Sequence, residues 1–226
     1  MNQTIQTDSG TNTALQPQIR RESAASKAEV LADIYQDEVN LSVWQRTLTP
    51  DLVGAADSII ESQGMLCIST SVTPIDAFDA LYQPLGGSAA AQSIAADIAE
   101  LVAMFCCLFE LKRAGLRFTT LDRAMCPKFH VDRVPCRLIS TYSGIATEWL
   151  PHDLVKRSAL GQGGSGKTDQ QLGVYASAHD IRTLCAGEVS LLKGESWLGN
   201  EGGGLVHRSP NLSAGQKRLL LTLDFN

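Results

Sequence analysis

The order of apolar and polar positions divides the chain into a helical first half and a strand-rich second half. In the first half, apolar residues such as Val30 and Ile34 recur three to four positions apart, which places them on one face of a helix. After Gly115 the period changes to two, with Leu116 and Phe118 separated by polar neighbours. The pattern therefore predicts helices followed by a sheet.

Local signals mark where the predicted helices begin. Thr49-Pro50-Asp51 combines an N-cap hydroxyl, a proline in the first turn and an early acid, and the helix should end near Gly64. Thr73-Pro74-Ile75-Asp76 repeats the signal for a brief helix. The longest predicted helix runs from residue 89 to about residue 114, and its broad apolar face should pack across the back of a sheet.

Short strands separated by turn signals are expected through the second half. The predicted strands are residues 65–71, 116–120, 124–134, 137–142, 172–176, 188–192, 204–207 and 218–225. This arrangement favours a sandwich or a jelly-roll barrel. We therefore predict an α+β fold, in which N-terminal helices pack against a C-terminal double-stranded β-helix (jelly-roll or cupin-like) barrel.

The predicted domain organisation follows from the same pattern. Residues 1–25 are rich in Gln, Thr, Ser and Asn and have few large apolar groups, so we expect a disordered tail. Residues 26–226 should form a single domain, mainly helical over 26–115 and a β-barrel over 116–226.

Composition narrows the class of protein. With 44% hydrophobic and 19% charged residues, the chain can form an ordinary globular core. The net charge of -5 argues against nucleic-acid binding. The first residues do not resemble a signal peptide, and the most apolar run, residues 101–109, is shorter than the about 20 residues that span a bilayer. We expect a cytoplasmic protein that does not enter a membrane.

The candidate chemistry lies in Phe129-His130-Val131-Asp132 and in the distant His207. In a strand, residues i and i+2 face the same side, so His130 and Asp132 can point at a common place. His207 would complete a set of two histidines and one carboxylate, which suits non-haem Fe(II) and leaves coordination positions open. Zinc accepts the same ligands, so the residues do not identify the metal. His152 follows a proline in an expected exposed turn and is interpreted as structural.

A competing motif is Gly161-Gln162-Gly163-Gly164-Ser165-Gly166-Lys167-Thr168, which matches the phosphate-binding pattern G-x-x-x-x-G-K-[ST]. That motif requires a buried strand before it and a helix after it. The preceding segment is charged, and the following residues enter a predicted strand too early. We interpret the match as a glycine-rich loop.

Several blocks resemble a bacterial domain-of-unknown-function family. They include Phe129–Asp132, Arg137-Leu138, Tyr142-Ser143-Gly144, Thr147–Leu150, Leu192–Glu195 and Gly204–Pro210. The same blocks are more distantly similar to the double-stranded β-helix oxygenases that use Fe(II) and 2-oxoglutarate. This resemblance implies that His130, Asp132 and His207 hold iron. It also implies that Arg218, eleven positions after His207, binds the far carboxylate of 2-oxoglutarate, with Tyr142 adding a hydroxyl contact.

Two functions remain open at this point. The first is an oxidoreductase of the dioxygenase type, using Fe(II) and 2-oxoglutarate on a small molecule that the sequence does not identify. The second is a zinc-binding regulatory or homeostasis protein on the same scaffold, without oxygenase activity.

Overall fold

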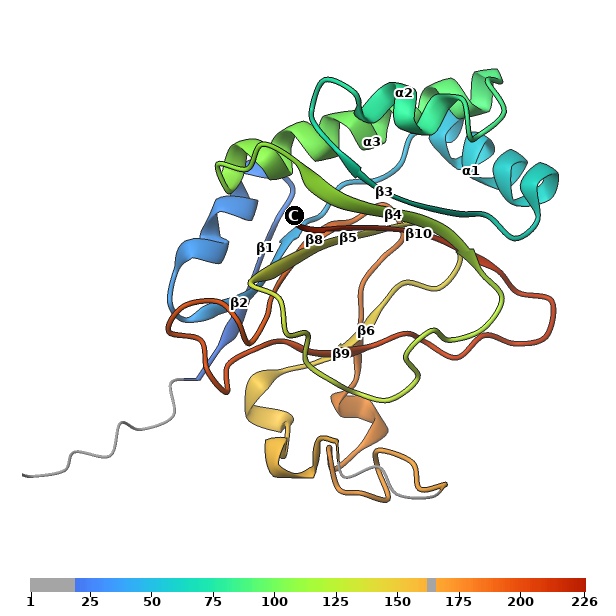
Figure 1. Cartoon of the computed structure of the whole chain (residues 1–226). Coiled ribbons are helices and arrows are strands. Elements are labelled where there is room, and N and C mark those ends of the chain that lie inside the picture. Colours follow the sequence, from blue (N-terminus) through green and yellow to red (C-terminus); the bar gives the residue numbers. More distant parts are fainter. Residues whose placement is uncertain (1–18, 162–165) are drawn as a thin grey trace, which may run out of the picture.

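Two facing β-sheets with the α-helices on one side form the architecture of the computed structural model, which describes residues 19–161 and 166–226 (Figure 1). The strands are β1 (Arg21–Ala25), β2 (Val39–Trp44), β3 (Cys67–Val72), β4 (Ala114–Leu121), β5 (Cys136–Ser143), β6 (Glu148–Leu150), β7 (Arg182–Thr183), β8 (Val189–Lys193), β9 (Val206–Arg208) and β10 (Arg218–Phe225). The seven-stranded major sheet has the order β1-β2-β8-β5-β10-β4-β3, and the three-stranded minor sheet has the order β7-β6-β9.

Helices α1 (Pro50–Gln63), α2 (Ala77–Tyr82) and α3 (Ala89–Leu108) cover the outer face of the major sheet, and the short helices after β6 lie on the side of the minor sheet (Figure 1). The 3-10 helices are η1 (Ala28–Tyr35), η2 (His152–Leu154), η3 (Arg157–Ala159) and η4 (Ala178–Asp180). The predicted cap of α1 is confirmed, because the Thr49 hydroxyl accepts a 3.3 Å hydrogen bond from the Leu52 N–H. Helix α3 ends before the predicted Ala114, which instead begins β4.

Helix α3 is long and apolar enough, by length and composition, to cross a membrane. Its residues Ile94, Ile98 and Val102 are fully buried in the core between the helices and the major sheet. Each such buried side chain contributes about 1.5–3 kcal/mol to folding. Packing in the core therefore accounts for the apolar composition of this helix.

The predicted division into a mainly helical part, residues 26–115, and a β-barrel part, residues 116–226, was only partly right. Three strands of the major sheet, β1, β2 and β3, come from the first half of the chain. The predicted tail was wrong over Arg21–Ala25, which forms β1, while residues 1–18 lie outside the described residues. Strand β2 alternates apolar and polar residues in Val39-Asn40-Leu41-Ser42-Val43, a local strand signal that the prediction missed, and its polar residues Asn40 and Ser42 are buried as well.

Strand β10 lies at the centre of the part of the major sheet that bears the site. It pairs antiparallel with β5 on one side and with β4 on the other. Leu219, Leu221 and Leu223 belong to the core on the helical side. Because side chains alternate along a strand, Arg218 and Thr222 point to the opposite side, toward the minor sheet.

Two other predicted segments are not strands. Residues 172–176 form a turn and an irregular segment, and residues 124–134 are irregular except for one bridge at His130. The glycine-rich motif follows the short helix η3 and leads into a turn at residues 169–173. Neither of these described neighbours is the strand or the helix that a phosphate-binding loop requires. Residues 162–165 of the motif lie outside the described residues.

Candidate metal centre

His130 and His207 lie directly opposite each other in an isolated antiparallel bridge. The N–H of each residue donates a 3.0 Å hydrogen bond to the carbonyl of the other. Residues paired in this way direct their side chains to the same side, and the two imidazole centroids are 4.7 Å apart. The predicted strand was wrong here, and the pairing with β9 aligns His130 instead.

Asp132 completes a triangle of donor atoms. Its Oδ1 lies 3.7 Å from His130 Nε2, and its Oδ2 lies 3.5 Å from His207 Nε2. One donor atom from each of the three residues lies within 4.8 Å of the others. Ligands on one face of an octahedral metal with bonds of about 2.1 Å lie about 3 Å apart. The triangle is therefore slightly wider than a metal-bound one and could close by small side-chain movements.

Backbone carbonyls determine which nitrogen of each histidine faces the centre. The Nδ1 of His130 lies 2.9 Å from the Lys128 carbonyl, and the Nδ1 of His207 lies 3.1 Å from the Leu205 carbonyl. A carbonyl only accepts, so each Nδ1 carries a proton, and Nε2 is the nitrogen of each ring that can bind a metal. Burial, and then the nearby His207, lowers the pKa of His130, which keeps its ring neutral. Both rings thus present Nε2 to the centre, and the His130 ring is in the neutral form that binds a metal.

Arg137 holds the carboxylate of Asp132. Its Nη1 lies 2.7 Å from Asp132 Oδ2, and it forms a second, two-pronged pair with Asp224 at 2.7 and 2.9 Å. Burial alone would raise the pKa of Asp132, but the hydrogen bond and charge of His207, with the charge of Arg137, lower it to about 2. The carboxylate is therefore ionised at neutral pH and carries the charge that a divalent cation needs.

Arg218 is a fully buried cation with neutral partners. Its guanidinium donates hydrogen bonds of 3.1–3.2 Å to the hydroxyls of Ser209, Thr141 and Thr147, while its Nε has no partner. Burial lowers its pKa to about 10, so it stays protonated at neutral pH. It lines a cavity of about 80 Å³ together with His130 and His207. An uncompensated buried cation beside the triad suits a carboxylate ligand.

The placement predicted for Tyr142 was wrong. Its hydroxyl donates to Asp97 on α3, and its ring packs edge-on against Phe118 in the core on the helical side. Neighbouring residues of a strand face opposite sides, so Thr141, and not Tyr142, reaches Arg218. The predicted hydroxyl contact is therefore available from Thr141.

Asp169 contacts both of the segments that carry the histidines. Its carboxylate, almost fully buried, accepts a 2.9 Å hydrogen bond from the N–H of Phe129 and lies 3.5 Å from the Arg208 guanidinium. Arg208 in turn lies 4.3 Å above the Phe129 ring. Phe129 precedes His130 and Arg208 follows His207, so one carboxylate fastens both histidine-bearing segments. The sequence does not point to Asp169, because the contact joins residues far apart in the chain.

Gly194 allows the segment after β8 to pass close to Asp132. A Cβ at this position would lie 2.0 Å from the Val134 carbonyl oxygen and 2.8 Å from that of Asp132. The next residue, Glu195, donates its N–H to the Asp132 carbonyl at 2.9 Å. Only glycine permits this approach, which fixes the backbone that carries the carboxylate.

The chain matches one protein family and is similar in fold to a solved structure. A family model described as "Protein of unknown function (DUF1826)" matches residues 25–224. No curated protein matches the chain significantly. A dioxygenase for auxin oxidation from rice has a TM-score of 0.51 at 10% identity, covering 91% of this chain and 82% of that one. Its similarity shows that the chain shares the fold of that dioxygenase.

Two further solved structures have lower TM-scores. The Neurospora crassa protein T7H, in complex with alpha-KG, has a TM-score of 0.46 at 10% identity, with 93% of this chain and 86% of that chain covered. A prolyl-4-hydroxylase from Pseudomonas putida has a TM-score of 0.44 at 15% identity, with coverages of 87% and 96%.

Proposed function

The chain belongs to the DUF1826 family, and we propose that it is a non-haem Fe(II)- and 2-oxoglutarate-dependent oxygenase that acts on a small polar molecule. One observation carries the proposal: the buried cation Arg218 lines the same cavity as His130 and His207. A metal triad alone would fit many functions. A triad with an unpaired buried arginine beside it fits a metal and an anionic co-substrate together.

Different residues of the site fit the metal and the co-substrate 2-oxoglutarate. His130, Asp132 and His207 would hold the metal through two neutral nitrogens and one carboxylate oxygen. Arg218 would bind the far carboxylate of 2-oxoglutarate through its planar fork. When bound, iron and 2-oxoglutarate together supply oxidation by molecular oxygen, with the co-substrate converted to succinate and carbon dioxide.

The surrounding side chains orient these groups before anything binds. Thr141, Thr147 and Ser209 hold the Arg218 guanidinium in one orientation, so little rotational freedom is lost when a carboxylate arrives. Arg137 fastens Asp132 through Oδ2 and leaves its Oδ1 without a described hydrogen bond to arginine. Burial of Arg218 keeps water away from its charge and strengthens the interaction with a carboxylate.

The zinc alternative gains nothing from the described geometry. A closed structural zinc site takes four protein ligands, and the triad supplies three. The same three ligands with open positions are the arrangement expected for iron that also binds a co-substrate and oxygen.

A second cavity indicates where the substrate would bind. It has a volume of about 410 Å³ and shares Met125, Arg137, Leu220 and Thr222 with the triad cavity. Its floor includes Ser69, Arg117 and Thr222, which are cross-strand partners on β3, β4 and β10. Neighbouring strands are about 4.8 Å apart, so these groups could contact one small molecule. The lining favours a polar substrate that reaches Arg117 with an acceptor group.

The decisive experiment measures co-substrate turnover. Full-length protein is loaded with Fe(II), supplied with ascorbate and 2-oxoglutarate, and assayed for succinate with and without candidate polar substrates. We expect slow succinate formation without substrate and none in His207→Ala. A protein with verified bound Fe(II) that forms no succinate, and gains no thermal stability from 2-oxoglutarate, would contradict the proposal.

The proposal also includes the localisation and the partners of the protein. The protein would work in the cytoplasm on a small molecule, without a nucleic-acid partner, and its net charge of -5 agrees with the latter.

A further inference from the structure

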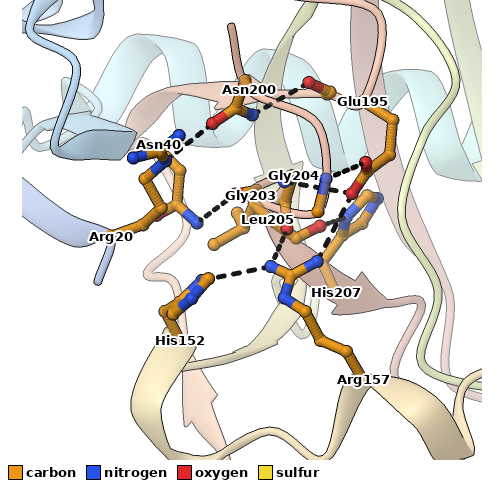
Figure 2. Close-up of polar contacts among 12 residues, drawn as sticks. Arg20, Asn40, His152, Arg157, Glu195, Asn200, Gly203, Gly204, Leu205 and His207 are labelled. Carbon is orange, nitrogen blue, oxygen red and sulfur yellow. Dashed lines mark hydrogen bonds and ion pairs between the residues drawn. The ribbon is translucent and has the colours of Figure 1, made fainter. Parts of the chain in front are cut away.

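A second buried arginine resembles Arg218 in its surroundings. Arg20 is 7% exposed, and its Nε donates to Asn200 Oδ1 at 2.8 Å while its Nη2 donates to the Gly199 carbonyl at 3.2 Å. Its Nη1 is buried without a hydrogen-bond partner. Both partners are neutral, so the structure describes no carboxylate that compensates this charge (Figure 2). Burying an arginine in this way is costly unless an anion binds to it.

Arg20 lines a cavity of about 480 Å³ between the start of β1 and the segment that follows β6. Asn40, Trp149, His152 and Arg182 are among its other lining residues, together with exposed Arg21, Glu22 and Asp153. This cavity shares no lining residue with the one that contains Arg218. It is therefore a separate space with a buried cation in its wall.

His152 adds a donor to this cavity. Its Nδ1 lies 3.2 Å from Arg157 Nη2, and a guanidinium only donates, so Nδ1 accepts and the proton lies on Nε2. Burial, followed by the charges of Arg157 and Arg20, lowers the pKa of His152 and keeps the ring neutral. Within residues 19–161 and 166–226, the Nε2–H of this neutral ring has no hydrogen-bond partner, so it can donate to a ligand.

The cluster around Arg20 carries an excess of positive charge. Arg157 pairs with Glu195 at 3.3 Å, and Figure 2 shows the carboxylate of Glu195 directed at this guanidinium and at the loop beside it. Lys193 is buried nearby, and burial, followed by the charge of Arg20, lowers its pKa to about 8. Burial, together with the charge of Arg20, also lowers the pKa of Arg157. The cavity lining itself holds three arginines, Arg20, Arg21 and Arg182, against the carboxylates of Glu22 and Asp153, so an anion bound to Arg20 would relieve the repulsion among these cations.

We propose that this cavity is a second anion-binding site, which takes a small oxyanion, a carboxylate or a phosphate, on Arg20, with His152 and Arg182 as further donors. The site does not depend on the proposed oxygenase activity, because none of its residues belongs to the metal triad or to the 2-oxoglutarate cavity.

The site is connected to His207 through one loop. Arg20 binds Gly199 and Asn200, Asn40 donates to the Gly203 carbonyl at 2.9 Å, and the following Leu205 carbonyl accepts from His207. An anion bound to Arg20 would therefore act on the loop that orients a metal ligand (Figure 2). The expected consequence is slower hydrogen exchange at the amides of residues 200–205 when the anion binds.

The test measures anion binding by calorimetry on metal-free full-length protein, with inorganic phosphate and malonate as separate probes and chloride at matched ionic strength as reference. We expect saturable binding of at least one probe, weakened at least tenfold in Arg20→Gln. Arg113→Gln is the matched control, because this exposed arginine does not line the cavity, and it should bind as the wild type does. Binding of phosphate alone or malonate alone identifies the class of anion.

Other variants separate this site from the 2-oxoglutarate cavity. Arg218→Gln should leave anion binding unchanged, and Arg182→Gln, an exposed substitution that should not disturb folding, should weaken it. If neither probe binds the wild type more tightly than chloride, the proposal fails. It fails equally if binding survives Arg20→Gln and Arg182→Gln but is lost in Arg218→Gln. Should Arg20→Gln not fold, the Arg182 and Arg218 variants still decide the question.

Discussion

Replacing Arg218 by methionine should separate the stability of the protein from its affinity for 2-oxoglutarate. Burial lowers the pKa of this arginine from 12.5 to about 10. At 1.36 kcal/mol per pKa unit, the charged form is penalised by about 3 kcal/mol on folding. Because the folded pKa lies below the unfolded one, the penalty is fully present at neutral pH and is relieved only as the pH rises above about 10.

The hydrogen bonds of Arg218 act in the opposite direction. Its three hydroxyl partners, Thr141, Thr147 and Ser209, contribute about 1 kcal/mol each. The two contributions nearly cancel, so metal-free Arg218→Met should unfold in urea within about 1 kcal/mol of the wild type. An arginine in a buried ion pair would behave differently, since its removal costs about 3–5 kcal/mol.

The affinity for 2-oxoglutarate should fall sharply in the same variant. A two-pronged pair between a guanidinium and a carboxylate contributes about 3 kcal/mol, or roughly a hundredfold in Kd. Thermal shifts with Ni(II) and increasing 2-oxoglutarate measure this change, and exposed Arg113→Met serves as a control that should alter neither quantity. A variant that loses much more stability, or that binds 2-oxoglutarate like the wild type, would refute the assignment of Arg218.

The remaining predictions concern the triad and its support. His130→Ala and His207→Ala should each lose most affinity for Ni(II) or Fe(II) in calorimetry, while the circular dichroism spectrum stays unchanged. The control Lys167→Ala, at an exposed position, should bind these metals normally. Stabilisation by ATP that depends on Lys167 would contradict the interpretation of the glycine-rich motif as a loop. Asp169→Asn keeps the size of the side chain but removes its charge, so it should weaken metal binding about tenfold and alter the visible spectrum of the Co(II) protein; an unchanged spectrum would exclude a role in positioning. Asp132, with a folded pKa of about 2 against an ordinary 3.8, should contribute about 2 kcal/mol of stability above pH 4, lost as the pH falls toward 2. In denaturant titrations at pH 6 and 3, the wild type should lose about 1 kcal/mol more stability than Asp132→Asn, because about half of this contribution is gone at pH 3.

The sequence by itself determined the features that depend on neighbouring residues. The cap at Thr49, the alternation along Arg218–Phe225 and the residue types of the triad are all readable locally. Helix caps and strand alternation depend on residues a few positions apart, so no knowledge of the rest of the chain is needed. The ability of His130, Asp132 and His207 to bind a metal likewise depends on the chemistry of each side chain alone.

Only the tertiary structure decided which of these residues meet. The bridge between His130 and His207 aligns the imidazoles, although the segment around His130 is not a strand. The register of β5 and β10 turns Thr141, and not Tyr142, toward Arg218. A shift of one residue exchanges the two faces of a strand, and the local pattern could not exclude it in a strand buried on both faces.

The supporting charges depend on the fold in the same way. Asp169 meets Phe129, and Arg20 meets Asn200, across long stretches of chain. The cost of leaving Arg20 or Arg218 without a carboxylate arises only from burial, which is a property of the packed structure. An arginine in a sequence has no such cost, because in the unfolded chain water solvates its charge.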